Sequence, residues 1–132
     1  MRMGKNPEKK KRFLYQRTEE ITMELAQQKC TTYKAGSPPL TRKETMELLG
    51  QVPGWSLNNG HVTKTFEKGD ANSCIAFFNE IATLATEEGH FPDICMKESR
   101  LVEVSLYTYP AGGLTKNDFI LAAKLNAMGH AQ

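Results

Sequence analysis

The sequence predicts an α+β fold, a four-stranded antiparallel sheet with helices on one face. Three patterns lead to this prediction. Apolar and polar residues alternate over residues 101–108, which is typical of a strand with one covered face. The turn Asn58-Asn59-Gly60 separates two short runs of strand formers, as in a β-hairpin. Apolar residues recur every three or four positions from Asp70 until Gly89 supplies a C-terminal stop, which indicates a long amphipathic helix.

The first half of the predicted domain is a helix followed by the hairpin. Thr41 followed by Glu44 forms a capping box, which marks a helix start, and Pro53-Gly54 ends this element. Residues 55–57 and 62–66 are the two strands that the Asn-Gly turn joins. The apolar face expected for this helix consists of Met46, Leu48, Leu49 and Val52.

The second half repeats this order with the longer helix. Strands over residues 94–97 and 101–108 form a second pair, and Gly112-Gly113 then turns the chain. Thr115 with Asp118 caps the last helix. The order is α-β-β-α-β-β-α, and because every helix has one apolar side, the economical packing places the helices on one face of the sheet. The long helix should bury most of the core through Cys74, Phe77, Phe78, Ile81, Leu84 and Ala85.

Composition and charge indicate one ordinary globular domain with a basic tip. The 132 residues are 39% hydrophobic and 24% charged, and the formal net charge is +2. Basic residues gather between positions 5 and 12, which suggests a basic tip and not a nucleic-acid-binding face. Residues 8–28 predict a helical arm, and residues 35–39 are typical of a linker. We therefore divide the chain into a basic, partly helical N-terminal arm with its linker, residues 1–39, and a domain, residues 40–132.

The cysteines and the apolar pattern exclude several classes of protein. Cys30, Cys74 and Cys95 are odd in number and form no C-x-x-C pair, so neither a disulfide framework nor a zinc site is indicated. No apolar stretch approaches the roughly 20 residues of a spanning helix, and no signal or transit peptide is recognisable. We expect a cytoplasmic protein that uses no metal and no cofactor and binds neither membrane nor nucleic acid.

The turn after the long helix carries a more specific pattern. It contains His90-Phe91-Pro92, and Tyr109 later precedes the helix start Gly113-Leu114-Thr115-Lys116-Asn117-Asp118. Over residues 40–125 the chain resembles the pterin-4a-carbinolamine dehydratases, which have His-His-Pro at this turn and a third histidine before a Gly-Leu-Thr/Ser-x-x-Asp helix start. The resemblance implies that His90 matches the first histidine, while Phe91 and Tyr109 replace the second and third.

These replacements bear on the family's chemistry. In the family the histidines bind the pterin and move protons while water leaves a 4a-hydroxytetrahydropterin, which needs a donor and an acceptor of near-neutral pKa. Phe91 can be neither, and a tyrosine is a poor base at pH 7. We therefore expect lost activity, with His90 retained as a helix-terminal residue. The alternative is an active dehydratase in tetrahydropterin recycling, in which His90 and Tyr109 handle the protons. His61 and His130 match no catalytic position and are expected to be solvated.

The His-Phe-Pro form narrows the resemblance further. Together with the run over residues 112–124, Gly-Gly-Leu-x-x-Asn-Asp-Phe-Ile-x-Ala-Ala-Lys, it is similar to the dehydratase-like Rubisco accumulation factors. Plant members of that group need a transit peptide, which we do not recognise here, so we expect the bacterial version associated with α-carboxysomes. This resemblance implies a non-enzymatic assembly chaperone that binds the Rubisco large subunit or its assembly intermediates, forms a dimer or tetramer, and can associate with the carboxysome. The candidate contact residues are His90, Phe91, Pro92 and Tyr109, with the N-terminal arm as a second candidate.

Overall fold

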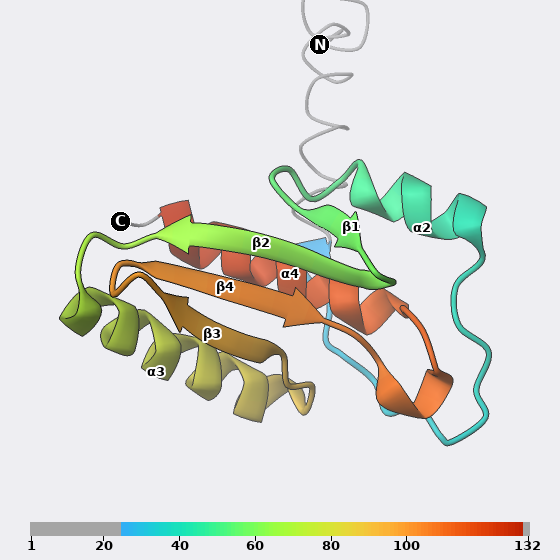
Figure 1. The fold of residues 1–132 in the computed structure, drawn as a ribbon. Helices are drawn as coiled ribbons and strands as arrows, with labels where there is room; N and C mark the ends of the chain where they lie inside the picture. Colours follow the sequence, from blue (N-terminus) through green and yellow to red (C-terminus); the bar gives the residue numbers. More distant parts are fainter. Residues whose placement is uncertain (1–24, 131–132) are drawn as a thin grey trace, which may run out of the picture.

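The computed structural model describes residues 25–130 and confirms the predicted α+β fold (Figure 1). Helices and strands alternate as the sequence indicated, with one 3-10 turn added before the last helix. The elements are α2 (Arg42–Leu49), β1 (Ser56–Asn58), β2 (His61–Glu67), α3 (Ala71–Glu88), β3 (Asp93–Lys97), β4 (Leu101–Leu106), η2 (Tyr109–Ala111) and α4 (Lys116–His130).

The four strands form one antiparallel sheet in the order β1-β2-β4-β3. Asn59 and Gly60 join β1 to β2 with φ angles of 52° and 81°. A tight hairpin turn of this kind requires positive φ at both central residues, which asparagine and glycine adopt at little cost. The long strands β2 and β4 pair at the centre, so β1 and β3 are the edge strands.

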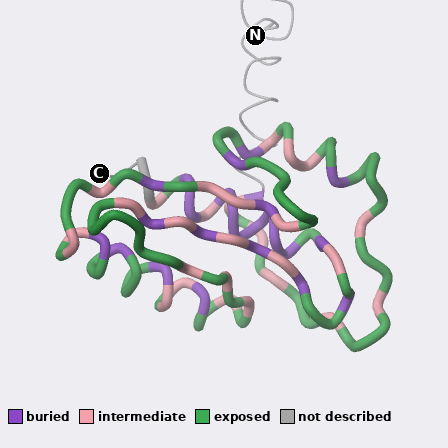
Figure 2. Tube along the Cα trace, viewed as in Figure 1, coloured by how far each residue is buried: buried purple, intermediate pink, exposed green. Residues whose placement is uncertain are grey.

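The core lies between one face of the sheet and the helices α3 and α4 (Figure 1, Figure 2). On β4 the inward residues are buried and alternate with partly exposed ones, as the alternation predicted. Phe77 of α3 packs edge-on against Phe66 of β2, with ring centroids 5.0 Å apart. Two expected core residues are exposed: Met46 on α2 and Phe78 on α3. The buried face of each of these helices is therefore narrower than its apolar pattern predicted.

The predicted capping residues lie at the ends of α2, α3 and α4, but the hydrogen bonds at the start of α4 differ from a capping box. The capping box of Thr41 and Glu44 is complete, and Gly89 ends α3 in the left-handed conformation with φ 70°. At the start of α4, the Asp118 carboxylate accepts from the Thr115 N–H, but the Thr115 hydroxyl instead pairs with that of Thr108. The prediction of a strand up to residue 108 was wrong at its end, because Thr108 leaves the sheet and bridges to Gly113.

The segment that precedes α2 packs onto the domain. Residues 25–27 are helical and Leu25 belongs to the core, whereas the rest of the predicted helix up to residue 24 lies outside the described residues. Further along, the Gly36 N–H donates to the Pro110 carbonyl and the Leu40 N–H to the Leu114 carbonyl. The predicted boundary at residue 39 stays a prediction, since most of the arm is not described. Among the described helices, none is long and apolar enough to cross a membrane.

Phe77 and Phe78 are adjacent on α3 and provide a matched test of this packing. Phe77 is 1% exposed and Phe78 is 41% exposed. We expect Phe77→Ala to lower the free energy of unfolding by about 3–5 kcal/mol, because it removes a buried ring and leaves a cavity. Phe78→Ala in the same helix should cost less than about 1 kcal/mol. Urea denaturation of both variants measures this, and equal losses would contradict the assignment of the core face.

Candidate functional site

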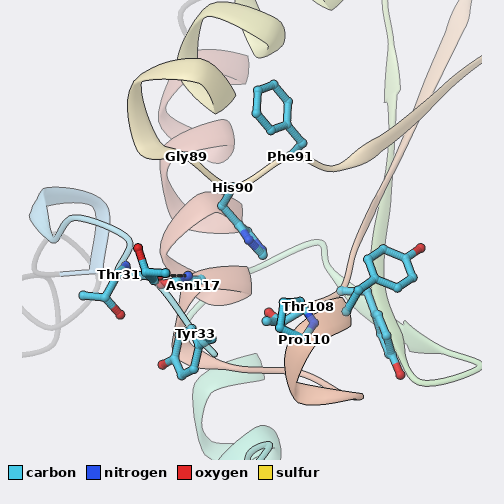
Figure 3. A pocket seen from close by; sticks show the side chains of 11 residues that line it. Thr31, Tyr33, Gly89, His90, Phe91, Thr108, Pro110 and Asn117 are labelled. Carbon is cyan, nitrogen blue, oxygen red and sulfur yellow. Dashed lines mark hydrogen bonds between the residues drawn. The ribbon is translucent and has the colours of Figure 1, made fainter. Parts of the chain in front are cut away.

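A cavity of about 350 Å³ lies where the end of α3, the start of α4, the turn η2 and residues 31–33 meet (Figure 3). It contains His90, the histidine that the sequence resemblance matched to a family position. Hydroxyl, amide and aromatic side chains make up most of the wall. The lining residues are Thr31, Thr32, Tyr33, Gly89, His90, Phe91, Tyr107, Thr108, Tyr109, Pro110 and Asn117.

Asp118 organises the inner wall of this cavity. Its carboxylate is fully buried, and Oδ1 lies 2.7 Å from His90 Nε2. Oδ2 accepts from the Thr108 hydroxyl at 2.8 Å and from the Thr115 N–H at 2.9 Å. A carboxylate only accepts hydrogen bonds, so His90 donates from Nε2, and Nδ1 is the ring nitrogen left for another partner. The position of His90 is therefore fixed from the first turn of α4.

Thr108 extends this network toward β4. Its hydroxyl donates to Asp118 and accepts from the Thr115 hydroxyl at 2.7 Å, and both threonines are buried. The Asp118 carboxylate thus joins the segment that follows β4 to the segment that precedes α4. The sequence analysis did not identify Thr108, because a threonine at the end of a predicted strand gives no signal of a distant partner.

Asn117 fixes the outer wall, which residues 31–33 provide. Its side-chain Oδ1 accepts from the Thr31 N–H at 2.9 Å, and its Nδ2 donates to the Thr31 carbonyl at 2.6 Å. One residue earlier, the Cys30 N–H donates to Glu88, whose other carboxylate oxygen lies 3.4 Å from Lys124 Nζ. Burial and the nearby negative charge of Glu88 raise the pKa of Cys30 to about 12, so this thiol stays neutral.

The predicted contact residues occupy different places around the cavity. His90 points into the cavity (Figure 3). Phe91 and Tyr109 also line it but are 61% and 65% exposed, so they lie at its rim. Pro92 is half-buried next to Phe91 and does not line the cavity. Phe91 therefore does not fill the cavity, which stays open.

Tyr109 does not take over a proton-transfer position beside His90. Its hydroxyl donates to Asp93 Oδ2 at 3.2 Å, and its ring packs against Tyr107. The hydrogen bond to Asp93, together with the negative charge of that carboxylate, raises the pKa of Tyr109 above its ordinary value. The expectation of a solvated His61 was wrong: its half-buried ring stacks on Tyr107, with centroids 4.4 Å apart, and its Nε2 has no partner.

Residues 38–128 match the family described as Pterin 4 alpha carbinolamine dehydratase. The chain belongs to the pterin-4a-carbinolamine dehydratase family. It is 36% identical over 106 residues to a provisionally named pterin-4-alpha-carbinolamine dehydratase of Rubrobacter xylanophilus, covering 80% of this chain and 98% of the relative. A relative with the same provisional name in Chloroflexus aurantiacus is 43% identical over 89 residues, covering 67% of this chain and 95% of the relative.

A solved structure of the family has the same fold. The transcriptional coactivator/pterin dehydratase of Brucella melitensis superposes with a TM-score of 0.64 at 28% identity, covering 69% of this chain and 98% of its own. The likeness supports the α+β fold described above. The cavity at the end of α3 in this chain is thus set in the family's framework.

The cavity of this family member offers hydrogen bonds but few proton-transfer groups. His90 contributes one imidazole, and Thr31, Tyr33, Thr108 and Asn117 contribute hydroxyl and amide groups. Within residues 25–130, no group of three or more His, Cys, Asp or Glu side chains is placed to hold a metal ion. The arrangement offers hydrogen bonds and ring contacts to a polar or aromatic group.

Asp118→Asn tests whether the buried carboxylate holds the site together. The amide would present a donor to His90 or to the Thr108–Thr115 pair, where only acceptors fit. We expect the free energy of unfolding to fall by about 2–4 kcal/mol, the usual cost of breaking a buried charged network. Asp93→Asn, at an exposed carboxylate, is the control and should cost less than about 1 kcal/mol. Equal stability of Asp118→Asn and the unchanged protein in urea denaturation would contradict this role.

Proposed function

We propose that this chain is a non-enzymatic member of its family that acts as an assembly chaperone for Rubisco. One observation carries the loss of catalysis: Tyr109, which replaces the third family histidine, is bonded to Asp93 at the rim and not directed to proton transfer. Phe91 replaces the second histidine and has no ionisable group. Of the three positions, only His90 retains the imidazole of the family pattern.

The geometry of His90 also favours a structural role. Loss of water from a pterin requires a group that donates to the departing hydroxyl and a second group that accepts a ring proton. His90 commits Nε2 to Asp118, which leaves only Nδ1 for a ligand. A raised pKa keeps Tyr109 protonated at neutral pH, so it is no base in the absence of strong activation. The dehydration reaction would therefore lack one of the two proton-transfer groups that it requires.

The choice of Rubisco as client rests on the sequence pattern of the site. His90-Phe91-Pro92 and the run over residues 112–124 resemble the dehydratase-like Rubisco accumulation factors of α-carboxysomes. The client would be the large subunit or an assembly intermediate, which exposes apolar surface until the holoenzyme closes. Exposed Phe91 and Tyr109 at the rim are suitable contact groups, since aromatic side chains dominate the energetics of many interfaces.

A second candidate, retained dehydratase activity, also has a specific observation in its favour. The cavity is open, and two of its lining residues, His90 and Thr108, are held by hydrogen bonds to the buried Asp118 carboxylate behind them. The relatives in Rubrobacter xylanophilus and Chloroflexus aurantiacus are provisionally named as dehydratases. In this case His90 and Tyr109 would handle the protons, with water supplying the remaining transfer.

Two assays on the full chain separate these candidates. We expect co-expression with Rubisco large and small subunits to raise the yield of soluble holoenzyme several-fold, measured by native gel and carboxylase activity. Phe91→Ser/Tyr109→Ser should reduce this gain, whereas Ile75→Ser, at an exposed apolar residue away from the cavity, should not. No gain with a well-folded protein would contradict the chaperone role for the Rubisco tested.

The dehydratase assay uses 4a-hydroxytetrahydropterin and the purified chain. We expect dehydration at the spontaneous rate, with no further change in His90→Ala. A clear acceleration that His90→Ala abolishes would establish the dehydratase alternative instead.

A further inference from the structure

The side chain of Tyr109 is exposed, yet its orientation is fixed. The residue is 65% exposed, and its hydroxyl donates to Asp93 Oδ2 at 3.2 Å. Its ring meets that of Tyr107 edge-on, with centroids 4.9 Å apart, and Tyr107 in turn packs against His61 of β2. Its backbone begins the turn η2, in which Pro110 follows directly. A ring held in this way before a partner arrives loses little conformational freedom on binding.

Asp93 adds an unbalanced negative charge at the end of this ring. Asp93 is exposed, and within residues 25–130 its carboxylate takes part in no ion pair. Glu103 lies on the same face of the sheet and is paired with Lys97 at 3.1 Å. The hydrogen bond that Asp93 accepts from Tyr109 comes from a neutral phenol, so it leaves the charge of the carboxylate in place. Asp93 and Tyr109 thus present a carboxylate beside an open aromatic ring.

The cavity behind this pair is lined by no lysine or arginine that would repel a cation. The one lining residue that can become positive, His90, points into the cavity and is paired with the buried carboxylate of Asp118 (Figure 3). Lys34 and Lys116 are next to lining residues in the sequence, but both are exposed and neither lines the cavity. Exposed charges of this kind are screened by salt. The charges at this part of the rim therefore favour a positively charged group.

A guanidinium group suits this rim better than an ammonium group. The guanidinium of arginine is planar, so it stacks on an aromatic face while two of its N–H groups donate to a carboxylate. The ammonium group of lysine is compact and more strongly hydrated, and it cannot stack. A histidine at position 109, as the family pattern has, can become positive and repel an arginine. Tyr109 stays neutral at neutral pH, because the hydrogen bond to Asp93 raises its pKa further above its ordinary value.

We propose that Tyr109 and Asp93 bind an arginine side chain of the client protein, whose guanidinium group stacks on the ring and donates to the carboxylate. The inference rests on the proposed function, since it defines the chemistry of one client contact at the rim. Tyrosine and arginine are both enriched among the interface residues that contribute most to binding. Exposed rings and exposed carboxylates are each common on protein surfaces, but here a hydrogen bond joins one of each at the mouth of a cavity.

Binding of a short arginine peptide to the full chain tests the proposal without Rubisco. The probe is acetyl-Gly-Arg-Gly-amide, and its matched control contains citrulline, which has nearly the same shape as arginine and no charge. We expect the arginine peptide to shift the NMR signals of Tyr109, Tyr107 and Asp93 in a saturable way at low salt, with a dissociation constant on the order of 10 mM. The citrulline peptide should bind at least about fivefold more weakly, and a lysine peptide should also bind more weakly.

Two substitutions remove the two contacts separately. Tyr109→Leu removes the ring, and Asp93→Asn removes the charge. Each should weaken binding of the arginine peptide about twofold to fivefold, the usual effect of losing an exposed cation–π contact or an exposed ion pair. Tyr109→Phe keeps the ring, so its binding should stay within about twofold of that of the unchanged chain. Phe78→Leu and Glu80→Gln, at an exposed ring and an exposed carboxylate of α3, are the matched controls and should leave binding unchanged.

The co-expression assay tests the same contact with the client. Asp93→Arg reverses the charge that faces the client's arginine, so it should reduce the gain in assembled Rubisco at least about twofold. Glu80→Arg makes the same change of charge on α3 and should leave the gain unchanged.

Several results would overturn the proposal. They are the absence of any saturable shift with the arginine peptide, equal binding of the citrulline or lysine peptide, and binding that neither Tyr109→Leu nor Asp93→Asn weakens. A gain in Rubisco that Asp93→Arg leaves intact would also contradict it, while the chaperone role would stand. Peptide binding without any gain in Rubisco would support the arginine site and contradict the Rubisco role alone.

Discussion

The buried carboxylate of Asp118 is the constraint on which the rest of the site depends. It satisfies three donors from three segments: the imidazole of His90 after α3, the hydroxyl of Thr108 after β4, and the N–H of Thr115 before α4. A fully buried carboxylate is tolerated only when it is hydrogen-bonded in this way. The helix start, the strand end and the histidine therefore hold one another in place, and the cavity is the space that they leave.

This arrangement is compatible with the loss of catalysis that we propose, because the replaced positions lie outside the Asp118 network. The two replaced positions, Phe91 and Tyr109, lie at the rim and make no contact with Asp118, so changing them leaves the inner wall intact. His90 belongs to that wall, and its removal would leave a buried acceptor without its partner. Retention of the one histidine then follows from stability. The same cavity, now bordered by exposed aromatic rings, is suited to contact with another protein.

Local sequence signals predicted most of the fold but not the contacts that build the site. The capping box at Thr41, the Asn-Gly turn and Gly89 each act within a few residues, and the structure confirms them. Asn117 and Thr31 are 86 positions apart, and neither residue type indicates such a partner. Phe78 and Met46 were misplaced because a periodic apolar stripe does not define how much of its width the sheet will cover. The predicted linker over residues 35–39 is held by backbone hydrogen bonds to Pro110 and Leu114 from Gly36 and Leu40, which composition cannot reveal.

Nitrogen NMR of the histidine rings in the full chain tests the central claim most directly. The account predicts that His90 carries a proton on Nε2 that is hydrogen-bonded to Asp118, with assignment by His90→Gln. In Asp118→Asn this preference for Nε2 should be lost, while the signals of His61 stay unchanged. A His90 ring protonated on Nδ1 alone would contradict the claim that this carboxylate organises the site. Histidine signals of His90 that are the same in Asp118→Asn as in the unchanged chain would also contradict it.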